Sequence, residues 1–200
     1  EESKSESDGE IYSFSNGLSS DNLEILEIPN FGSSMDRFKT DEAARVRWTF
    51  DGQEIFKSGV RAMAQASAEA IEKSGLSKED VEIFIPHQAN IRIVEALEKK
   101  LGLPNATTIK KVHRYGNTSA ASIPTAFVDA LEEGEIKGGE IAVFTAVGAG
   151  LAWGACAVRL GDRVTPINKS DAKLPEFDGT ATDTIRRAIE YQVPDKLDKI

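Results

Sequence analysis

Apolar positions change their spacing abruptly near the middle of this chain. Residues 81–85 form a short apolar run typical of a buried strand, and residues 91–101 carry apolar side chains at helical spacing. Between these two segments stands His87, directly after a proline. The junction of a strand end and a helix N-terminus is a place where polar groups meet ligands in α/β proteins. His87 is therefore the first candidate site residue.

The same order of elements recurs further along the chain. Residues 107–112 include β-branched side chains that predict a strand, and residues 119–133 predict a helix that begins with small residues. Asn117 stands at this second junction, after a glycine. Taken alone, His87 is compatible with a hydrogen-bonded core histidine, and Asn117 with an ordinary turn residue. Taken together, the two junctions predict that His87 and Asn117 face one another across a single site.

The remaining pattern supplies the other elements of an α/β domain. Further strands are predicted over residues 10–14, 23–28, 140–146 and 152–160, and further helices over residues 60–74 and 180–191. The last two strands are joined by a glycine-rich turn and are expected to be antiparallel. Residues 53–58 are compatible with a strand or with the start of a helix. Counted from Gln53 as a strand, the order is βαβαβαββ, which indicates a mixed sheet with helices on both faces.

Composition and charge narrow the function classes. A chain of 200 residues with 40% hydrophobic content is long enough for one domain with its own core. A net charge of −9 argues against nucleic acid as a partner, and no apolar run is long enough to predict a membrane span. A single cysteine excludes an internal disulfide and fits a cytoplasmic location. No cluster of cysteine and histidine has metal-site spacing, so no metal is expected.

The charge is unevenly distributed. Residues 87–114 contain six basic and two acidic residues within an otherwise acidic chain. A local excess of basic residues is compatible with an anionic ligand or partner, and equally with a solvated helix face.

Three sequence blocks carry a resemblance to a known family. PHQANIRI, RYGNTSAASIP and VGAGLAWGACAVRL stand in this order along the chain and resemble the second half of a β-ketoacyl synthase III of the thiolase superfamily. The resemblance covers about residues 9–160 and implies an α/β, thiolase-like half that is incomplete without an N-terminal half. The tail from residue 161 is similar to the extension found on some ketosynthases of secondary metabolism, including those that condense and cyclise β-ketoacyl chains.

The resemblance implies an acyltransferase that performs a decarboxylative Claisen condensation of a malonyl-carrier-protein thioester with an acyl-coenzyme A, in fatty acid or related synthesis. By motif match, His87 and Asn117 are the two donors that stabilise the enolate oxygen. Backbone N–H groups of Gly148 and Ala149 match the turn that forms part of the acyl oxyanion hole. The usual family residue at the position of Ala149 is glycine, and a backbone donor survives that change.

Two further residues carry over from the same resemblance. Asn90 matches a residue near the pantetheine arm, and Arg92 matches a basic residue that meets coenzyme A phosphate or the acyl-carrier protein. No permanently bound cofactor is implied, because coenzyme A and carrier-protein thioesters are substrates. The family also implies a dimer.

The reactive cysteine of the family lies in the first half and has no counterpart in this sequence. Cys156 stands in an apolar strand and is expected to be an inert, buried thiol. We therefore expect the chain alone to be inactive and a cysteine-bearing half, on the same or a separate chain, to complete the site. The expected divisions are a remnant of the N-terminal half (1–30), a linker (31–52), the C-terminal thiolase-like domain (53–160) and an extension (161–200).

Several alternatives stay open at this level. The chain is compatible with a fragment, a split synthase completed by another chain, or a cleaved product of a longer precursor. In place of a catalytic half, it is also compatible with a non-catalytic partner subunit of a heteromeric ketosynthase that retains the His–Asn pair, or with half of a synthase that condenses and cyclises β-ketoacyl thioesters. Residues 10–28 are expected to lack sheet partners without the missing half.

Overall fold

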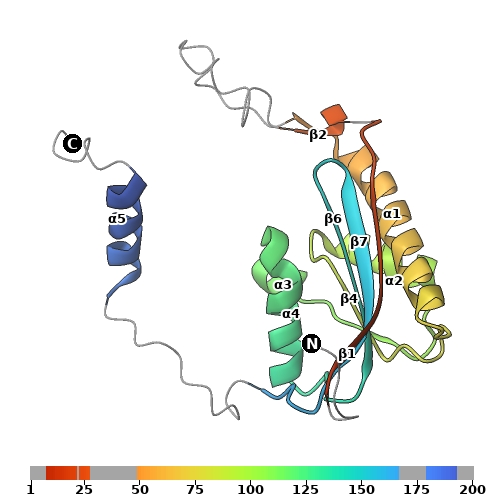
Figure 1. Ribbon diagram of the computed structural model, residues 1–200. Coiled ribbons are helices and arrows are strands. Elements are labelled where there is room, and N and C mark those ends of the chain that lie inside the picture. Colours follow the sequence, from red (N-terminus) through yellow and green to blue (C-terminus); the bar gives the residue numbers. More distant parts are fainter. Residues whose placement is uncertain (1–7, 22, 28–48, 167–178, 193–200) are drawn as a thin grey trace. The chain divides into compact units, whose positions relative to one another are not determined.

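The computed structural model describes residues 8–21, 23–27, 49–166 and 179–192 (Figure 1). Contacts divide the chain into two compact units, Glu1–Lys169 and Ser170–Ile200, and each is described by itself. Most of the predicted linker, residues 31–52, lies outside the described residues. The boundaries predicted after residues 30, 52 and 160 stay predictions.

A five-stranded sheet forms the centre of the first unit. Its strands, in spatial order, are β1 (Glu10–Leu18), β7 (Ala152–Arg159), β6 (Ile141–Gly148), β4 (Ile83–Pro86) and β5 (Thr107–Thr108). The central strand β4 runs parallel to β5 and β6, whereas β7 is antiparallel to β6 and to β1. The sheet is therefore mixed, and the predicted antiparallel pair at the end of the domain is confirmed.

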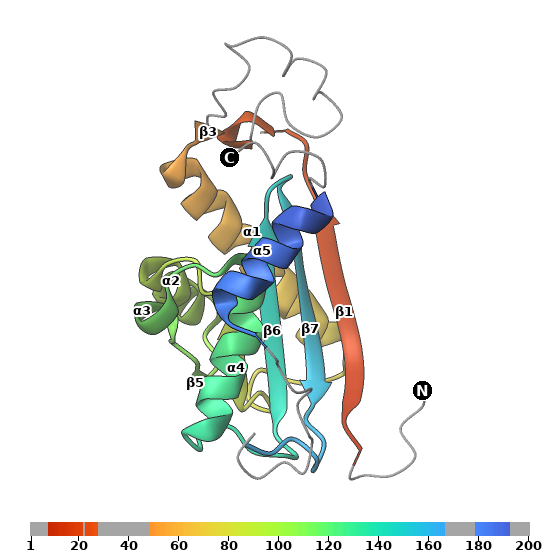
Figure 2. The same ribbon diagram turned by 90° about the vertical axis from the view of Figure 1, so that its left-hand side faces the viewer.

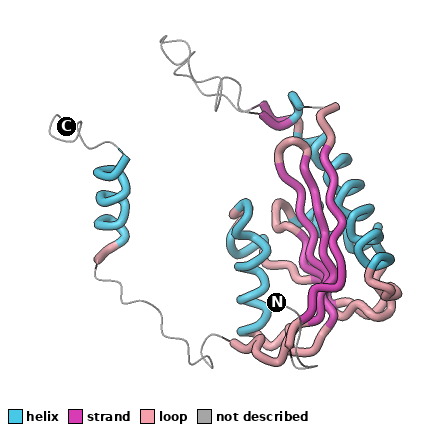
Figure 3. The backbone as a smooth tube through the Cα atoms, viewed as in Figure 1, coloured by secondary structure: helices cyan, strands magenta, loops and turns pink. Residues whose placement is uncertain are grey.

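Helices cover both faces of this sheet, as expected (Figures 1 and 3). Helices α1 (Gly52–Lys73) and α2 (Ile91–Leu101) lie on one face, and α4 (Ser122–Glu132) lies on the other. Strand β4 is buried on both sides, because Phe84 packs into the core under α1 and α2 while Ile83 and Ile85 pack into the core under α4. This explains why the β4 sequence is continuously apolar rather than alternating.

The smaller elements complete the description. They are the short helices η1 (Leu23–Ile25), α3 (Val112–Tyr115) and η3 (Ser119–Ala121), and a two-stranded sheet of β2 (Leu26–Glu27) and β3 (Thr49–Phe50). Predicted strand 23–28 is thus shorter than expected and pairs with β3, not with β1.

Helix α1 resolves the ambiguity over residues 53–58. The side chain of Asp51 accepts hydrogen bonds from the backbone N–H groups of Gln53 and Glu54, which fixes the start of the helix there. The interpretation of this segment as a strand is therefore wrong. The order βαβαβαββ is nevertheless recovered among these elements when β1 is counted as its first strand and the separate β2–β3 pair is left aside.

Strand β1 corrects a second expectation. It pairs with β7 along its length, from Glu10 opposite Arg159 to Leu18 opposite Ala152. The expectation that this segment lacks sheet partners is wrong, because the second strand of the terminal hairpin provides its ladder. Figure 2 shows β1 at the sheet edge and α4 over the β5–β6 side, with β7 and β1 extending beyond α4.

The second unit contains helix α5 (Ala181–Gln192), within one residue of the predicted helix 180–191. The Thr180 Oγ1 atom accepts from the Asp183 N–H at 3.2 Å, and the Asp183 carboxylate accepts from the Thr180 N–H at 2.8 Å. This reciprocal pair satisfies backbone donors at the start of the helix. Among the described residues, no helix is long and apolar enough to cross a membrane.

Candidate active site

His87 follows directly on strand β4. Its backbone N–H donates to the carbonyl oxygen of Thr145 at 2.8 Å, which extends the β4–β6 ladder by one residue and fixes the backbone. The ring is half-buried, and its Nδ1 atom lies 2.6 Å from the Oγ atom of Ser122 at the start of α4. The predicted strand–histidine–helix junction is therefore present. The imidazole is held by α4, which lies on the sheet face opposite α2.

Burial also affects the charge of His87. Loss of solvation disfavours the imidazolium and lowers the pKa of His87 below its ordinary value of 6.5. The ring is therefore neutral at neutral pH, with one nitrogen that donates and one that accepts. A neutral imidazole at this junction agrees with the role expected from the sequence.

The side chain of Gln88, the residue after His87, makes four hydrogen bonds to the backbone. Gln88 is 2% exposed, and its Nε2 donates to the carbonyl oxygens of Pro86 and Ile109 at 2.7 and 3.1 Å. Its Oε1 accepts from the N–H groups of Lys111 and Val112 at 2.9 and 3.2 Å. The Gln88 amide thus ties the end of β4 to the segment leading to Asn117. This also explains why β5 is shorter than the predicted strand 107–112, since the Gln88 side chain replaces the ladder from the Ile109 carbonyl onward.

A cavity of about 370 Å³ opens beside the His87 ring. Its walls come from the β4 end, the start of α4 and the β6–β7 hairpin, and they are formed by His87, Ser119, Ala120, Ser122, Ile123, Ala146, Val147, Gly148, Ala152, Trp153 and Gly154. The cavity therefore combines one imidazole with mostly small or apolar neighbours. Apolar walls around a small number of polar groups are typical of a ligand-binding site.

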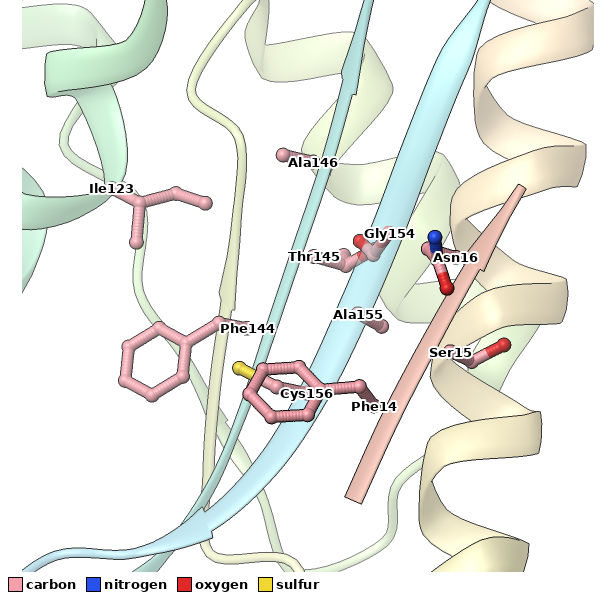
Figure 4. Close-up of a pocket in the computed structure, with 10 residues that line it drawn as sticks. All are labelled: Phe14, Ser15, Asn16, Ile123, Phe144, Thr145, Ala146, Gly154, Ala155 and Cys156. Atoms are coloured by element: carbon pink, nitrogen blue, oxygen red, sulfur yellow. The ribbon is translucent and has the colours of Figure 1, made fainter. Parts of the chain in front are cut away.

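A second cavity of about 510 Å³ continues along the same face of the sheet. It shares Ile123, Ala146 and Gly154 with the first cavity. Figure 4 shows Phe14 and Cys156 among its lining residues, whereas the side chain of Ser15 points toward α1. Most of this lining is apolar. Part of it comes from β1, the edge strand of the sheet.

Asn117 occupies a different environment from His87. Its side chain is exposed, and its Oδ1 accepts from the backbone N–H of Ser119 at 2.9 Å. The amide oxygen is thereby used within the turn, which leaves the amide N–H groups as donors. Asn117 is not among the residues that line the cavity beside His87. The convergence of these two side chains on one site stays a prediction.

The segment before Asn117 is anchored on α4. The guanidinium of Arg114 bonds both Asp129 and Glu133 at 3.0 Å, and the Tyr115 hydroxyl donates to Asp129 at 2.8 Å. Gly116 follows with φ +66° and ψ −158°, a backbone conformation that side chains with a Cβ rarely adopt. These features set the direction in which the chain enters Asn117.

The two residues predicted for the oxyanion hole lie at the β6–β7 turn. Gly148 ends β6 opposite Ala152 and lines the cavity beside His87. Ala149 lies in the turn and is exposed. Their function as backbone donors to a reacting oxygen stays a prediction.

Asn90 and Arg92 are both exposed at the start of α2. The Asn90 Oδ1 accepts from the Arg92 backbone N–H at 2.8 Å, so Asn90 is the N-cap of this helix. That structural role was not expected from the sequence, although Asn before an apolar helical pattern is a familiar signal for it. Binding of pantetheine or a carrier protein by these residues stays a prediction.

Half of the basic residues in the 87–114 segment are paired with acids. Lys110 bonds Glu98 at 2.7 Å, the buried Lys111 bonds Glu133 and Glu135, and Arg114 forms the pairs described above. The other three, Arg92, Lys99 and Lys100, are exposed on α2. Within residues 87–114, the basic charge available to an anionic partner therefore lies on α2.

Cys156 is half-buried and is one of the residues lining the larger cavity. The expectation of full burial is thus too strong, but burial raises the pKa of its thiol and disfavours the reactive thiolate. Cys156 does not line the cavity beside His87. Among the described residues, no group of three or more histidine, cysteine or acidic side chains is arranged to hold a metal ion.

Two residues of this site were missed by sequence reasoning. Ser122 stands within a run of serine and alanine that indicates close packing, and Gln88 stands between two residues already singled out. The signal available for Gln88 was a long polar side chain between a buried strand and an apolar helix. Ser122 had no comparable signal, since its contact with His87 joins residues far apart in the chain.

Known proteins match the chain in the same region. Residues 71–160 match the family model described as the C-terminal part of 3-oxoacyl-[acyl-carrier-protein] synthase III. The chain is 46% identical over 177 residues to β-ketoacyl-[acyl-carrier-protein] synthase III 2 of Vibrio cholerae, covering 88% of this chain and 48% of that protein. It is 53% identical over 111 residues to the synthase III of Bacillus pumilus, covering 56% and 36%.

Solved structures agree with the sequence relatives. The β-ketoacyl-[acyl-carrier-protein] synthase III of Thermus thermophilus superposes with a TM-score of 0.64 at 37% identity, covering 76% of this chain and 46% of that one. The priming β-ketosynthase of the R1128 polyketide pathway gives a TM-score of 0.70 at 30% identity, with the same coverage. The chain spans about half the length of these relatives, for example 48% of the Vibrio cholerae protein. Residues 71–160 are therefore similar to the C-terminal part of 3-oxoacyl-[acyl-carrier-protein] synthase III, and the chain shares the thiolase-like fold of these solved structures.

Proposed function

We propose that this chain supplies the His–Asn half of a condensing site of the synthase III type. The reaction is a decarboxylative Claisen condensation of a malonyl-carrier-protein thioester with an acyl group. The observation that carries the proposal is the position of His87: a neutral, half-buried imidazole at a cavity of about 370 Å³, with Nδ1 engaged by Ser122. Its Nε2 atom has no protein hydrogen-bond partner among the described residues and is available to a reacting oxygen.

Decarboxylation breaks the bond between the malonyl carboxylate and the α-carbon and releases carbon dioxide. The electron pair remains as an enolate, with negative charge on the thioester oxygen. Donors from His87 and Asn117 stabilise that charge, and removal of one such donor typically slows a reaction by about 10²–10³-fold. The α-carbon then attacks the acyl thioester, forms the new carbon–carbon bond and expels a cysteine thiolate. Backbone N–H groups of Gly148 and Ala149 stabilise the intermediate oxyanion of this second step.

The nucleophilic cysteine comes from a second, cysteine-bearing half on the same or a separate chain. Cys156 is unsuited to this part, because burial raises its pKa and it lines the other cavity. The pattern of β1 supports a covering partner. Its Ser13 and Ser15 face α1 and bond Ala70 and Glu69, whereas Phe14 is 63% exposed on the opposite side. An apolar residue on the uncovered side of an edge strand is typical of a surface that another element covers.

The direct test measures release of carbon dioxide from a malonyl thioester by this chain joined to, or expressed with, its cysteine-bearing half. His87→Ala and Asn117→Ala should each lower the rate by about 10²–10³-fold. His113→Ala is the matched control, because the other histidine of the chain is exposed on α3. The chain alone should show no condensation. Unchanged rates in both site variants would favour the second candidate, a non-catalytic partner subunit that retains the pair.

Arg92 is proposed to meet coenzyme A phosphate or the acyl-carrier protein. It is exposed on α2, as are Lys99 and Lys100. Arg92→Glu should raise the KM for carrier-protein or coenzyme A thioesters more than the KM for a short pantetheine thioester, since only the former bring anionic groups. Equal losses with both kinds of substrate would contradict this role.

A further inference from the structure

The hydrogen bonds around Ser122 determine more than the position of His87. Ser122 is 3% exposed, and its Oγ accepts from the backbone N–H of Gln88 at 3.2 Å. The same Oγ lies 2.6 Å from the Nδ1 atom of His87. A serine hydroxyl carries one proton and two lone pairs. With one lone pair occupied by Gln88, the hydroxyl proton needs an acceptor.

Among the described residues, Nδ1 of His87 is the one acceptor within hydrogen-bond distance of the Ser122 hydroxyl. We propose that the Ser122 hydroxyl donates to Nδ1 and thereby holds His87 in the tautomer with its proton on Nε2. Ser122 is then a positioning residue that acts through His87. The backbone of Gln88 orients the hydroxyl, and the ladder bond from His87 N–H to Thr145 holds the ring in place.

The opposite tautomer would have a different chemical consequence. With the proton on Nδ1, the ring would donate to Ser122, and Nε2 would offer a lone pair instead of an N–H. A lone pair repels a developing enolate oxygen, whereas an N–H stabilises it. The catalytic meaning of Ser122 therefore rests on the proposed function, but the tautomer itself is a property of the folded chain and is measurable without any reaction.

The chain is well suited to that measurement because it contains two histidines. Nitrogen-15 labelling of histidine, with the His113→Gln variant to assign the signals, gives the protonation state of each ring nitrogen of His87 by NMR at neutral pH. The expected result is a protonated Nε2 and an unprotonated Nδ1 in the unaltered protein. Observation of a protonated Nδ1 would overturn the proposal.

Ser122→Ala removes the donor and should move the Nδ1 signal toward that of an exchanging mixture of tautomers. It should also raise the pKa of His87, because a hydrogen bond that stabilises the neutral ring is lost. Ser67→Ala is the matched control: Ser67 is a buried helical serine whose hydroxyl bonds the Met63 carbonyl oxygen, away from His87. An unchanged tautomer in Ser122→Ala would contradict the proposal.

Ser122→Thr retains the hydroxyl and should retain the Nε2–H tautomer, which separates loss of the donor from general damage to the fold. If Ser122→Ala fails to fold, the unaltered protein and Ser122→Thr still decide the matter, since a protonated Nδ1 in either refutes it. In the completed enzyme, Ser122→Ala should lower decarboxylation by roughly 10–100-fold, by analogy with the loss of a partner that orients a metal-binding histidine. A changed tautomer with an unchanged rate would refute the proposed function and leave this inference standing.

Discussion

The two strand–helix junctions of this domain look alike in sequence and differ in structure. The first, around His87, has a buried strand, a half-buried polar residue and a capped helix. The second, around Asn117, has a two-residue strand, two short helices and an exposed polar residue. The first junction is determined by an apolar run and its neighbours in the sheet. The second depends on side chains that reach across from elsewhere, and above all on Gln88.

Removal of the Gln88 amide should have the largest effect on the free energy of unfolding. Gln88→Leu leaves four backbone groups without their side-chain partner, those of the buried Pro86, Ile109 and Lys111 and of the half-buried Val112. Each unsatisfied buried group costs about 1–3 kcal/mol, so the free energy of unfolding should fall by roughly 4 kcal/mol or more. Urea denaturation followed by circular dichroism measures this loss. Gln65→Leu, on the exposed face of α1, should change stability by less than about 0.5 kcal/mol.

A finer comparison is between the glycine that precedes Asn117 and the glycine that ends α2. Gly116 has φ +66° and ψ −158°, whereas Gly102 at the end of α2 has φ 59° and ψ 65°. A Cβ added at either position meets no atom within 4 Å, so only backbone conformation decides the cost. Asparagine adopts the conformation of Gly102 readily but not that of Gly116. Gly116→Asn should therefore cost about 1–3 kcal/mol of unfolding free energy, and Gly102→Asn clearly less; equal losses would show that the Asn117 turn is not specially constrained.

The same contrast explains what was predictable. The β4 strand, α2 and His87 follow from local patterns, because burial on both faces makes β4 apolar and α2 is amphipathic. The β6–β7 hairpin follows likewise from its glycines. By contrast, the partner of β1 is a strand at the far end of the domain, and no local pattern identifies it. Residues 53–58 were ambiguous because the Asp51 cap, which selects the helix, lies outside the apolar run.

The candidate site divides in the same way. His87 and Asn117 were found by motif, but the bond from Ser122 to His87 and the four bonds of Gln88 depend on tertiary contact. Whether Asn117 turns toward the His87 cavity depends on contacts that its own sequence does not specify. Sequence therefore identified chemical groups, and the fold supplied the partners that orient them.

Acid should affect the first junction and spare the second. The folded pKa of His87 is lowered by burial, so below its ordinary value of 6.5 the unfolded chain binds the proton more readily than the folded one. The His87 contribution to stability is therefore full above pH 6.5 and is lost as pH falls toward the folded pKa. Unfolding free energies at pH 7.5 and 5.5 should differ less in His87→Gln than in the unaltered protein. The exposed His113→Gln should retain the original difference; if it removes the difference instead, His87 is not the responsible group.

The smallest expected effect concerns the anchor that joins α3 to α4. Tyr115→Phe removes the hydroxyl that donates to Asp129 at 2.8 Å, while the Arg114 guanidinium still bonds the same carboxylate. Because Tyr115 is 41% exposed, water replaces the lost partner, and stability should fall by less than about 1 kcal/mol. The pKa of Tyr115 is raised chiefly by its hydrogen bond to Asp129, so Asp129→Asn should bring the spectrophotometric titration of Tyr115 back toward its ordinary range. An unmoved Tyr115 titration would show that Tyr115 does not hold α3 on α4 through Asp129, and the Asn117 turn would then rest on Gln88, Gly116 and the Arg114–Glu133 pair.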